Sequence, residues 1–225
     1  MDTELLRFAN DWASSSPELS MVLRFFYRDA VKNLLPVLIL WGLWFAKKGE
    51  ERTAQREVLI SVLFLTVFSI LAARAMANTL PHRDRPIHNA ESGAVMLDWM
   101  PDSAFQGMSA FPSDHAVMFF TLATGLFCVS RVAGAVALLH AGLIVCLPRV
   151  AIGAHWPSDI LAGALFGIVT IVLFLRPLTV LIRKWRFIPF FETREVIAYP
   201  LFFLATYEVA RMFKSTRTVL EILLE

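Results

Sequence analysis

The stretch Pro148–Asp159, "PRVAIGAHWPSD", separates two long apolar runs and contains charged and polar side chains. Arg149, His155 and Asp159 all lie within it. Ionisable side chains are costly inside a membrane, so we expect them at the ends of membrane-spanning helices. Pro157 suits the first turn of a helix, and the second apolar run is expected to begin there. The stretch therefore predicts a polar turn between two spans.

The composition of the whole chain supports a membrane location. Of its 225 residues, 57% are hydrophobic and only 18% are charged, and the mean hydropathy is +0.60, well outside the range of soluble domains. The net charge is only +2, and the basic residues are scattered, which argues against a nucleic-acid-binding protein. Cys128 and Cys146 lie inside apolar runs and are interpreted as small buried hydrophobic residues.

We expect an all-α, polytopic membrane protein with a six-transmembrane-helix bundle. Crossing a bilayer core of about 30 Å takes roughly 20 apolar helical residues, so the shorter segments are expected to tilt or to thin the bilayer. The expected spans are residues 31–47, 58–80, 114–130, 133–148, 157–177 and 196–213.

The chain is expected to form one domain, with the six-helix bundle at residues 31–225 preceded by two short interfacial helices at residues 1–30. Apolar residues recur at helical spacing in this N-terminal part and are interrupted by Ser residues and Pro17. A packed amphipathic pair is the alternative interpretation of the same pattern.

Topology places the polar loops on one side of the membrane. If residues 58–80 cross it, then residues 81–113 lie on the far side, and residues 149–156 return to that side after a hairpin of two spans. The loops on the opposite side collect more Lys and Arg, which favours that side as cytoplasmic. The polar loops are therefore expected to face the exterior.

The polar loops contain the residues of an anion site. Besides the opening stretch, they include "HRDRP" at residues 82–86 and "FPSDH" at residues 111–115. Ser113 is a natural N-cap for the following apolar helix, whose first backbone N–H groups would face the loop. Helix N-termini attract anions, and guanidinium groups such as Arg85 and Arg149 can bind a phosphate bidentately.

Two imidazoles accompany these arginines. Asp159 can reach back to His155 and fix its tautomer, which leaves the other ring nitrogen free to attack, while His115 remains as a proton donor. A metal site formed by both His residues with Asp114 and Asp159 is an alternative. Two arginines directed at the same point would repel a divalent cation, so we expect no metal or other cofactor. Asp114 is interpreted first as an acid that complements the helix dipole.

At these residues the sequence resembles the type-2 phosphatidic acid phosphatase superfamily, which comprises membrane lipid phosphatases related to vanadium haloperoxidases. The family signature is Lys-x6-Arg-Pro, Pro-Ser-Gly-His and Ser-Arg-x5-His-x3-Asp. The second motif is Pro112-Ser113-Asp114-His115, with Asp in the Gly position. The third is Pro148-Arg149, His155 and Asp159, with Pro in the Ser position. The resemblance covers about residues 58–177, and the form "FPSDHA" is most similar to the bacterial branch that acts on undecaprenyl diphosphate.

The first motif is only partial. Arg85-Pro86 matches it, but Asn78 occupies the position where the family has Lys. Arg74, one helical turn earlier, or Arg83 could supply the missing charge, and the sequence does not choose between them.

The resemblance implies a mechanism and a set of roles. His155 would attack phosphorus to form a phosphohistidine, His115 would protonate the departing oxygen, and Asp159 would hold His155. The expected substrate-binding residues are Arg85, Arg149, Ser113, Asp114, Arg83, Arg74 and Asn78. The substrate would be a lipid phosphate or diphosphate in the bacterial inner membrane, with the active site facing the periplasm.

Other functions remain open at this point. The same phosphate-binding motifs would serve a phosphatase for phosphatidic acid, phosphatidylglycerol phosphate or lipid A phosphate. A membrane transporter or a lipid-binding scaffold is the non-enzymatic alternative.

Two further patterns suggest packing roles. The run from Gly163 to Gly167 has small residues four positions apart, which would allow a close helix–helix approach, although chance explains it equally well. Phe105, Met108 and Phe111 could form a lipid gate before the second motif, and loop packing is the alternative.

Overall fold

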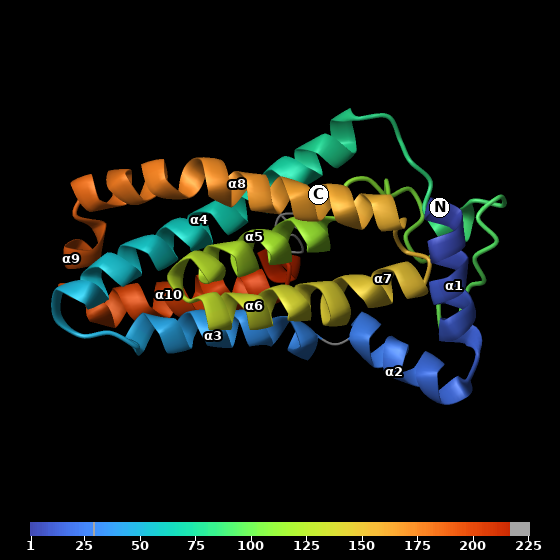
Figure 1. The fold of residues 1–225 in the computed structure, drawn as a ribbon, viewed down its shortest axis with the longest axis horizontal. Helices are drawn as coiled ribbons and strands as arrows, with labels where there is room; N and C mark the ends of the chain where they lie inside the picture. The colour runs from blue at the N-terminus through green and yellow to red at the C-terminus, as the bar shows by residue number, and fades with distance from the viewer. Residues whose placement is uncertain (29, 217–225) are drawn as a thin grey trace.

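The computed structural model describes residues 1–28 and 30–216, and all its regular elements in that range are helical (Figure 1). The all-α prediction is confirmed. The helices are α1 Asp2–Ser14, α2 Pro17–Arg28, α3 Leu34–Phe45, α4 Gly49–Thr79, α5 Asp114–Val129, α6 Arg131–His140, α7 Leu147–Ala151, α8 Pro157–Lys184, α9 Phe187–Glu192 and α10 Glu195–Ala210. A π-helical segment, Ala141–Cys146, joins α6 to α7, and short 3-10 turns occur at Ala30–Asn33 and Pro86–His88.

Helix length supports fewer membrane spans than the apolar runs predict. Within the described residues, three helical stretches are long and apolar enough to cross a membrane: Gly49–Thr79, Arg131–Ala151 and Pro157–Lys184. Two shorter apolar stretches are Val31–Phe45 and Asp114–Val129. The last predicted span forms α10, which has only 16 residues. The structure thus supports a multi-pass helical protein, while the count of six stays a prediction.

The long helices pack around α5, which contacts α4, α6 and α8. Val117, Met118, Phe119 and Leu122 of α5 are completely buried. Both cysteines are free, and the prediction that both are buried holds only for Cys146. Cys128 is exposed because it lies near the end of α5, on the outside of the bundle.

Two glycines bring α8 against α5. A Cβ atom on Gly163 would lie 2.8 Å from the carbonyl oxygen of Ser113. On Gly167 it would lie 2.7 Å from both the backbone nitrogen of Thr121 and the carbonyl oxygen of Val117. Such distances are too short for a real side chain, so the close-packing interpretation of the glycine pattern is confirmed. The contact also sets the N-terminus of α5 beside the start of α8.

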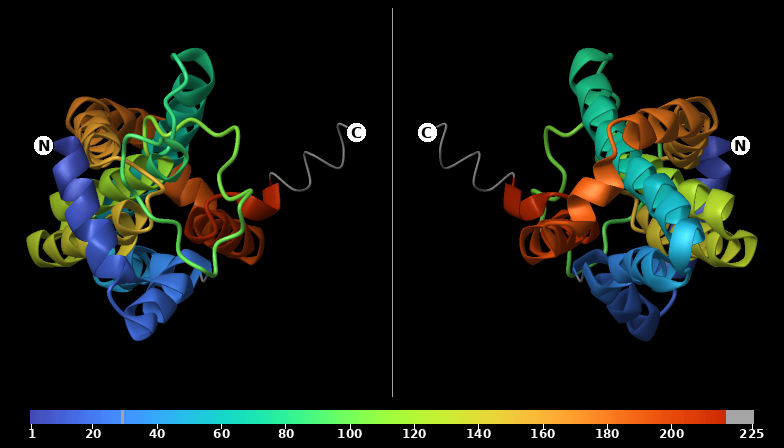
Figure 2. Two further views of the ribbon diagram at one scale, coloured as in Figure 1. Left: turned by 90° about the vertical axis from the view of Figure 1, so that its right-hand side faces the viewer. Right: turned by 90° about the vertical axis from the view of Figure 1, so that its left-hand side faces the viewer.

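A hydrophobic cluster separate from the core around α5 covers one end of the bundle. There α1 lies across the bundle, over the loop that joins α4 to α5 (Figure 1; Figure 2, left). The side-chain amide nitrogen of Asn10 donates to the carbonyl oxygens of Val95 (3.1 Å) and Ala151 (2.9 Å), and its oxygen accepts from the Val95 N–H (2.7 Å). Helix α1 therefore fastens this loop to α7, as the packed-pair interpretation requires.

A neighbouring side of α1 is apolar and exposed. Leu5, Phe8 and Trp12 are all exposed, so this side suits contact with lipid. The interfacial location of α1 stays a prediction, because packing on the loop and contact with the membrane surface are compatible.

We predict that Gly167→Ala destabilises the protein by about 1–3 kcal/mol, because the new methyl group must displace backbone atoms of α5. The control is Gly42→Ala in α3, where a Cβ atom would meet nothing within 4 Å. Alanine is the better helix former there, so Gly42→Ala should keep or raise the melting temperature. Thermal unfolding of the purified variants in detergent measures both effects, and equal melting temperatures would contradict the close contact.

Candidate active site

The three predicted motif segments meet at the end of the bundle that α1 covers. The Ile87 N–H donates to the carbonyl oxygen of Gly153 (3.1 Å), and the Ala110 N–H donates to that of Arg83 (2.8 Å). The Ser113 N–H donates to the carbonyl oxygen of Asp159 at 3.3 Å. These backbone contacts confirm that the two polar loops lie on the same face of the bundle.

Arg85 and His155 form the first pair of the site. Arg85 is 9% exposed and His155 is 2% exposed. The guanidinium of Arg85 donates to the carbonyl oxygens of Met108 (3.2 Å), Ser109 (3.2 Å) and Ala154 (2.8 Å). Its Nη1 also lies 3.2 Å from Nε2 of His155. Its hydrogen-bond partners are thus neutral groups.

The tautomer of His155 follows from its other neighbour. Nδ1 of His155 lies 2.8 Å from the carbonyl oxygen of Ala110, which can only accept, so Nδ1 carries the proton and Nε2 carries the lone pair. Burial and the positive charge of Arg85 hold the pKa of His155 below its ordinary value of 6.5, against the opposing effect of Asp159. The ring is therefore neutral at neutral pH, and its free lone pair faces the guanidinium.

Asp159 supports His155 less directly than the sequence predicts. Its Oδ2 lies 3.8 Å from Nδ1 of His155, beyond hydrogen-bond length, and accepts instead from the Trp156 N–H at 2.8 Å. Its Oδ1 accepts from Arg83. The prediction of a direct hydrogen bond is wrong, because the two oxygens of Asp159 accept from the Trp156 N–H and from Arg83 instead. Asp159 instead fixes the turn that presents His155.

His115 and Arg149 form the second pair. Nδ1 of His115 lies 2.9 Å from Oδ1 of Asp114, and Nε2 lies 2.7 Å from Nη2 of Arg149. Arg149 is 8% exposed and makes no ion pair with a carboxylate within the described part of the chain. Its guanidinium carbon lies 5.9 Å from the ring centroid of Tyr27. Asp114, in the position where the family has Gly, therefore orients the imidazole toward a buried cation.

Ser113 has the predicted capping role. Its hydroxyl accepts from the Ala116 N–H at 3.5 Å and so caps the N-terminus of α5. Asp114 and His115 follow in the first turn, where Oδ1 of Asp114 accepts from the His115 N–H at 2.8 Å. An anion that enters here would meet a helix N-terminus as well as the arginines.

A hollow of about 500 Å³ opens beside these groups. Arg74, Asn78, Arg85, Asp114 and His155 contribute to its lining. Of the two arginines that could replace the family's Lys, Arg74 lines the hollow. Its Nη2 lies 3.6 Å from Oδ2 of Asp114, so the structure favours Arg74 over Arg83.

Arg83 instead lies behind the turn. It pairs with Asp159 and with Asp2, and its guanidinium carbon lies 5.5 Å from the ring centroid of Trp156. This position makes Arg83 a support for the site.

Phe105 belongs to the packing of the loop. Its ring lies 4.6 Å from the guanidinium carbon of Arg85 and packs edge-on against Tyr27. Met108 is exposed and contributes to the lining of the hollow. Phe105 therefore packs within the loop, as the alternative interpretation predicts. Met108 instead lies at the hollow, where a residue of a lipid gate would have to lie.

Asp2 also supports the site, which the sequence did not predict. Its Oδ1 accepts from the Ser158 N–H (2.9 Å), and its Oδ2 accepts from the Ser158 hydroxyl (2.6 Å) and from Arg83 (3.0 Å). The first turn of α1 thus caps the start of α8 and holds Arg83, which in turn holds Asp159. No local sequence pattern indicates this role, because Asp2 and Ser158 are far apart in the sequence.

We predict that Asp2→Leu loosens the start of α8, because it removes both acceptors of Ser158 and one partner of Arg83. Hydrogen–deuterium exchange at the first amides of α8 should become about tenfold faster, the factor expected for losing one charge-assisted hydrogen bond of about 1.4 kcal/mol. Glu4→Gln is the control, since Glu4 is exposed and pairs only with the N-terminal amine. Unchanged exchange in Asp2→Leu would contradict the role of Asp2.

The chain is similar to several named proteins. The Escherichia coli protein YbjG, provisionally named an undecaprenyl-diphosphatase, is 30% identical over 75% of this chain and 78% of its own length. Lipid A 1-phosphatase of Rhizobium johnstonii is 35% identical over 47% of this chain and 42% of its own length. The bacitracin transport permease protein BcrC of Bacillus licheniformis is 24% identical over 76% and 77%. No solved structure gives a significant match. A match to the PAP2 superfamily spans residues 3–173, and the chain therefore belongs to that superfamily of membrane phosphatases.

Proposed function

We propose that this protein is a metal-independent lipid phosphatase that removes the terminal phosphate from a polyprenyl diphosphate, with undecaprenyl diphosphate as the best-supported substrate. One observation carries the proposal: Arg85 and Arg149 are both buried, and each lies against an imidazole instead of a carboxylate. A buried cation is costly without an opposite charge, so the site is prepared for an anion that arrives from outside.

His155 is the proposed nucleophile. Its Nε2 lone pair would attack the terminal phosphorus, so that an N–P bond forms while the bond from phosphorus to the bridging oxygen breaks. The leaving group is the lipid monophosphate. Water then cleaves the phosphohistidine, releases inorganic phosphate and regenerates the neutral ring.

His115 is the proposed acid for the leaving oxygen. In the structure its Nε2 accepts from Arg149, so this nitrogen carries no proton there. A bound phosphate would draw Arg149 toward its own oxygens, and its negative charge would favour the protonated ring. Asp114 accepts from the other nitrogen and would stabilise that charged form. The same ring can later take a proton from the attacking water.

The remaining groups stabilise charge on the phosphoryl oxygens. Arg85, Arg149 and Arg74 would bind them, next to the N-terminal end of α5 and its helix dipole. Asn78 lines the same hollow and offers an uncharged amide where the family motif has Lys. This chemistry requires no metal ion. In the described residues, no group of three or more His, Cys, Asp or Glu side chains is placed to hold one.

The names of the relatives support the substrate class. YbjG matches most of this chain and carries the name of an undecaprenyl-diphosphatase, whereas the lipid A phosphatase matches less than half. A phosphatase for phosphatidic acid, phosphatidylglycerol phosphate or lipid A phosphate would use the same contacts.

A transporter or scaffold is less well supported, although one relative is named a transport permease. Transporters usually place ionisable groups near the bilayer mid-plane, and here they lie at helix ends. We place the protein in a bacterial inner membrane with the site on the periplasmic side, because the opposite loops carry more Lys and Arg.

We predict that wild-type protein mixed with terminally labelled undecaprenyl diphosphate forms an acid-labile, base-stable phosphoenzyme, and that it does so in the presence of EDTA. His155→Gln should abolish labelling and lower phosphate release by at least about 10³-fold, as loss of a nucleophile does in other enzymes. His82→Gln is the matched control, since His82 is an exposed imidazole that lines the same hollow and pairs with Asp84.

Rapid quenching followed by gel analysis gives the measurement. A His155→Gln protein that keeps its phosphoenzyme or its turnover would contradict the assignment of the nucleophile. A wild-type activity that disappears in EDTA and returns with a divalent cation would contradict metal independence.

A further inference from the structure

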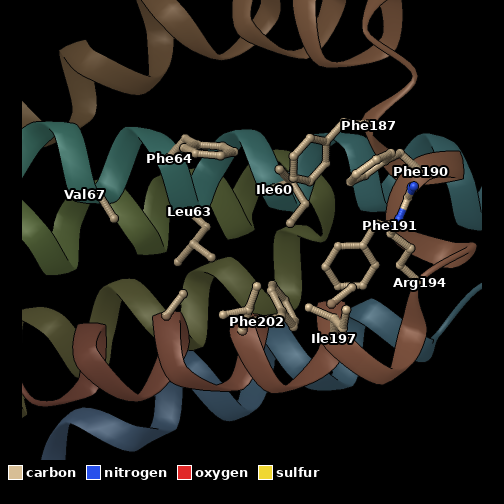
Figure 3. Close-up of a pocket in the computed structure, with 13 residues that line it drawn as sticks. Ile60, Leu63, Phe64, Val67, Phe187, Phe190, Phe191, Arg194, Ile197 and Phe202 are labelled. Carbon is tan, nitrogen blue, oxygen red and sulfur yellow. The ribbon is translucent and has the colours of Figure 1, made fainter.

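An apolar groove of about 470 Å³ lies far from the site, where α4, α9 and α10 meet (Figure 3). Its walls are apolar side chains from all three helices, and Arg194 is its one charged lining residue. Figure 3 shows residues of α4 facing residues of α10 across the groove, with the phenylalanines of α9 at one end. Helices α9 and α10 lie outside residues 3–173, so the family match does not cover this feature.

The groove and the phosphate hollow share one face of α4. Residues three or four positions apart lie on the same face of a helix. The face in question carries, in order, Ile60, Phe64, Val67, Leu71, Arg74 and Asn78. The first three line the groove, and the last two line the hollow. Leu71 connects them and is 61% exposed, so the described residues leave the face open between the two sites.

Helix α10 follows the same path. It lines the groove from Ile197 to Ala205. Just beyond its end, the carbonyl oxygen of Met212 lies 3.4 Å from Nη2 of Arg74, at the hollow. The chain at the end of α10 therefore also reaches the phosphate hollow, and an elongated apolar ligand could extend from the groove to that hollow along α4.

The distance from the phosphate hollow to the groove along α4 indicates which kind of ligand could reach the groove. At 1.5 Å per residue, Val67 and Ile60 lie about 10 and 21 Å from Arg74 along α4. Half of a bilayer core is about 15 Å thick, so an acyl chain anchored at the level of the hollow ends near the mid-plane. The groove extends past that depth. A polyisoprenoid tail longer than one leaflet reaches it.

We propose that this groove, formed by Ile60, Phe64 and Val67 of α4 with the facing residues of α9 and α10, binds the distal part of the substrate's polyprenyl tail. The inference rests on the proposed function and deepens it, since it explains selection for a long prenyl chain. Lipid already solvates the tail, so the groove contributes shape complementarity and dispersion contacts more than hydrophobic transfer. It should affect the use of long substrates and leave the chemical step unchanged.

Arg194 closes the end of the groove. Its guanidinium carbon lies 4.2 Å from the ring centroid of Phe190. An anionic phospholipid of the opposite leaflet, with its phosphate on Arg194, is the competing occupant. Continuity with the phosphate hollow along α4 favours the substrate tail.

The test fills the groove from each wall, with Val67→Trp in α4 and Ala205→Trp in α10. The control is Phe68→Trp, since Phe68 is 54% exposed on α4 and does not line the groove. We expect each groove variant to lower kcat/KM for undecaprenyl diphosphate by about tenfold, as overpacking of a fitted site would. Activity on the short farnesyl diphosphate should stay within about twofold, and the control should behave as wild type with both substrates.

The outcomes separate this inference from the proposed function. Groove variants that keep full activity on the long substrate would overturn the inference, and so would equal loss on both substrates by folded protein. A wild-type protein that hydrolyses neither diphosphate would instead overturn the proposed function.

A second measurement guards against misfolded variants. Wild-type protein is crosslinked to undecaprenyl diphosphate that carries a photoreactive group at its distal end. Labelling of groove residues is expected, and labelling confined to other helices would overturn the inference. Loss of a copurifying anionic phospholipid in Arg194→Gln, with no such labelling in wild type, would favour the competing occupant.

Discussion

Two buried guanidinium groups without carboxylate partners are the constraint on which the site depends. Arg85 is held by three backbone carbonyl groups and an imidazole, and Arg149 lies against the ring of His115. Burial lowers the pKa of Arg85 from its ordinary value, and the positive charge of Arg149 acts in the same direction, against the opposing effect of Asp114 and Asp159. A structure that keeps such charges out of water needs an anion to complete it.

Contacts of α5, α8 and α1 hold this arrangement in place. The glycines of α8 allow α5 to approach so closely that the N-cap Ser113 and the turn before α8 become neighbours. Asp159 ties that turn together, Arg83 holds Asp159, and Asp2 of α1 holds Arg83. The N-terminal helix is thus part of the support of the site, and its apolar outer side remains available to the membrane.

Much of this could be predicted from the sequence, because the decisive signals are local. Apolar runs indicated the helices, proline and serine marked the starts of α8 and α5, and the order of the spans placed both histidines and both arginines on one face. The partners of Asp159 could not be predicted, because a helix N-terminus and a distant arginine compete for its oxygens. Asp2 carries no local signal, since its partners lie far along the chain. The choice of Arg74 over Arg83 also required the packed loop.

A structure with bound orthovanadate, which mimics phosphate during transfer, tests the central claim most directly. We predict vanadium bonded to Nε2 of His155, with its oxygens bound by Arg85 and Arg149 and with His115 facing the apical oxygen. Vanadate bound away from these arginines, or attached to a different side chain, would contradict it.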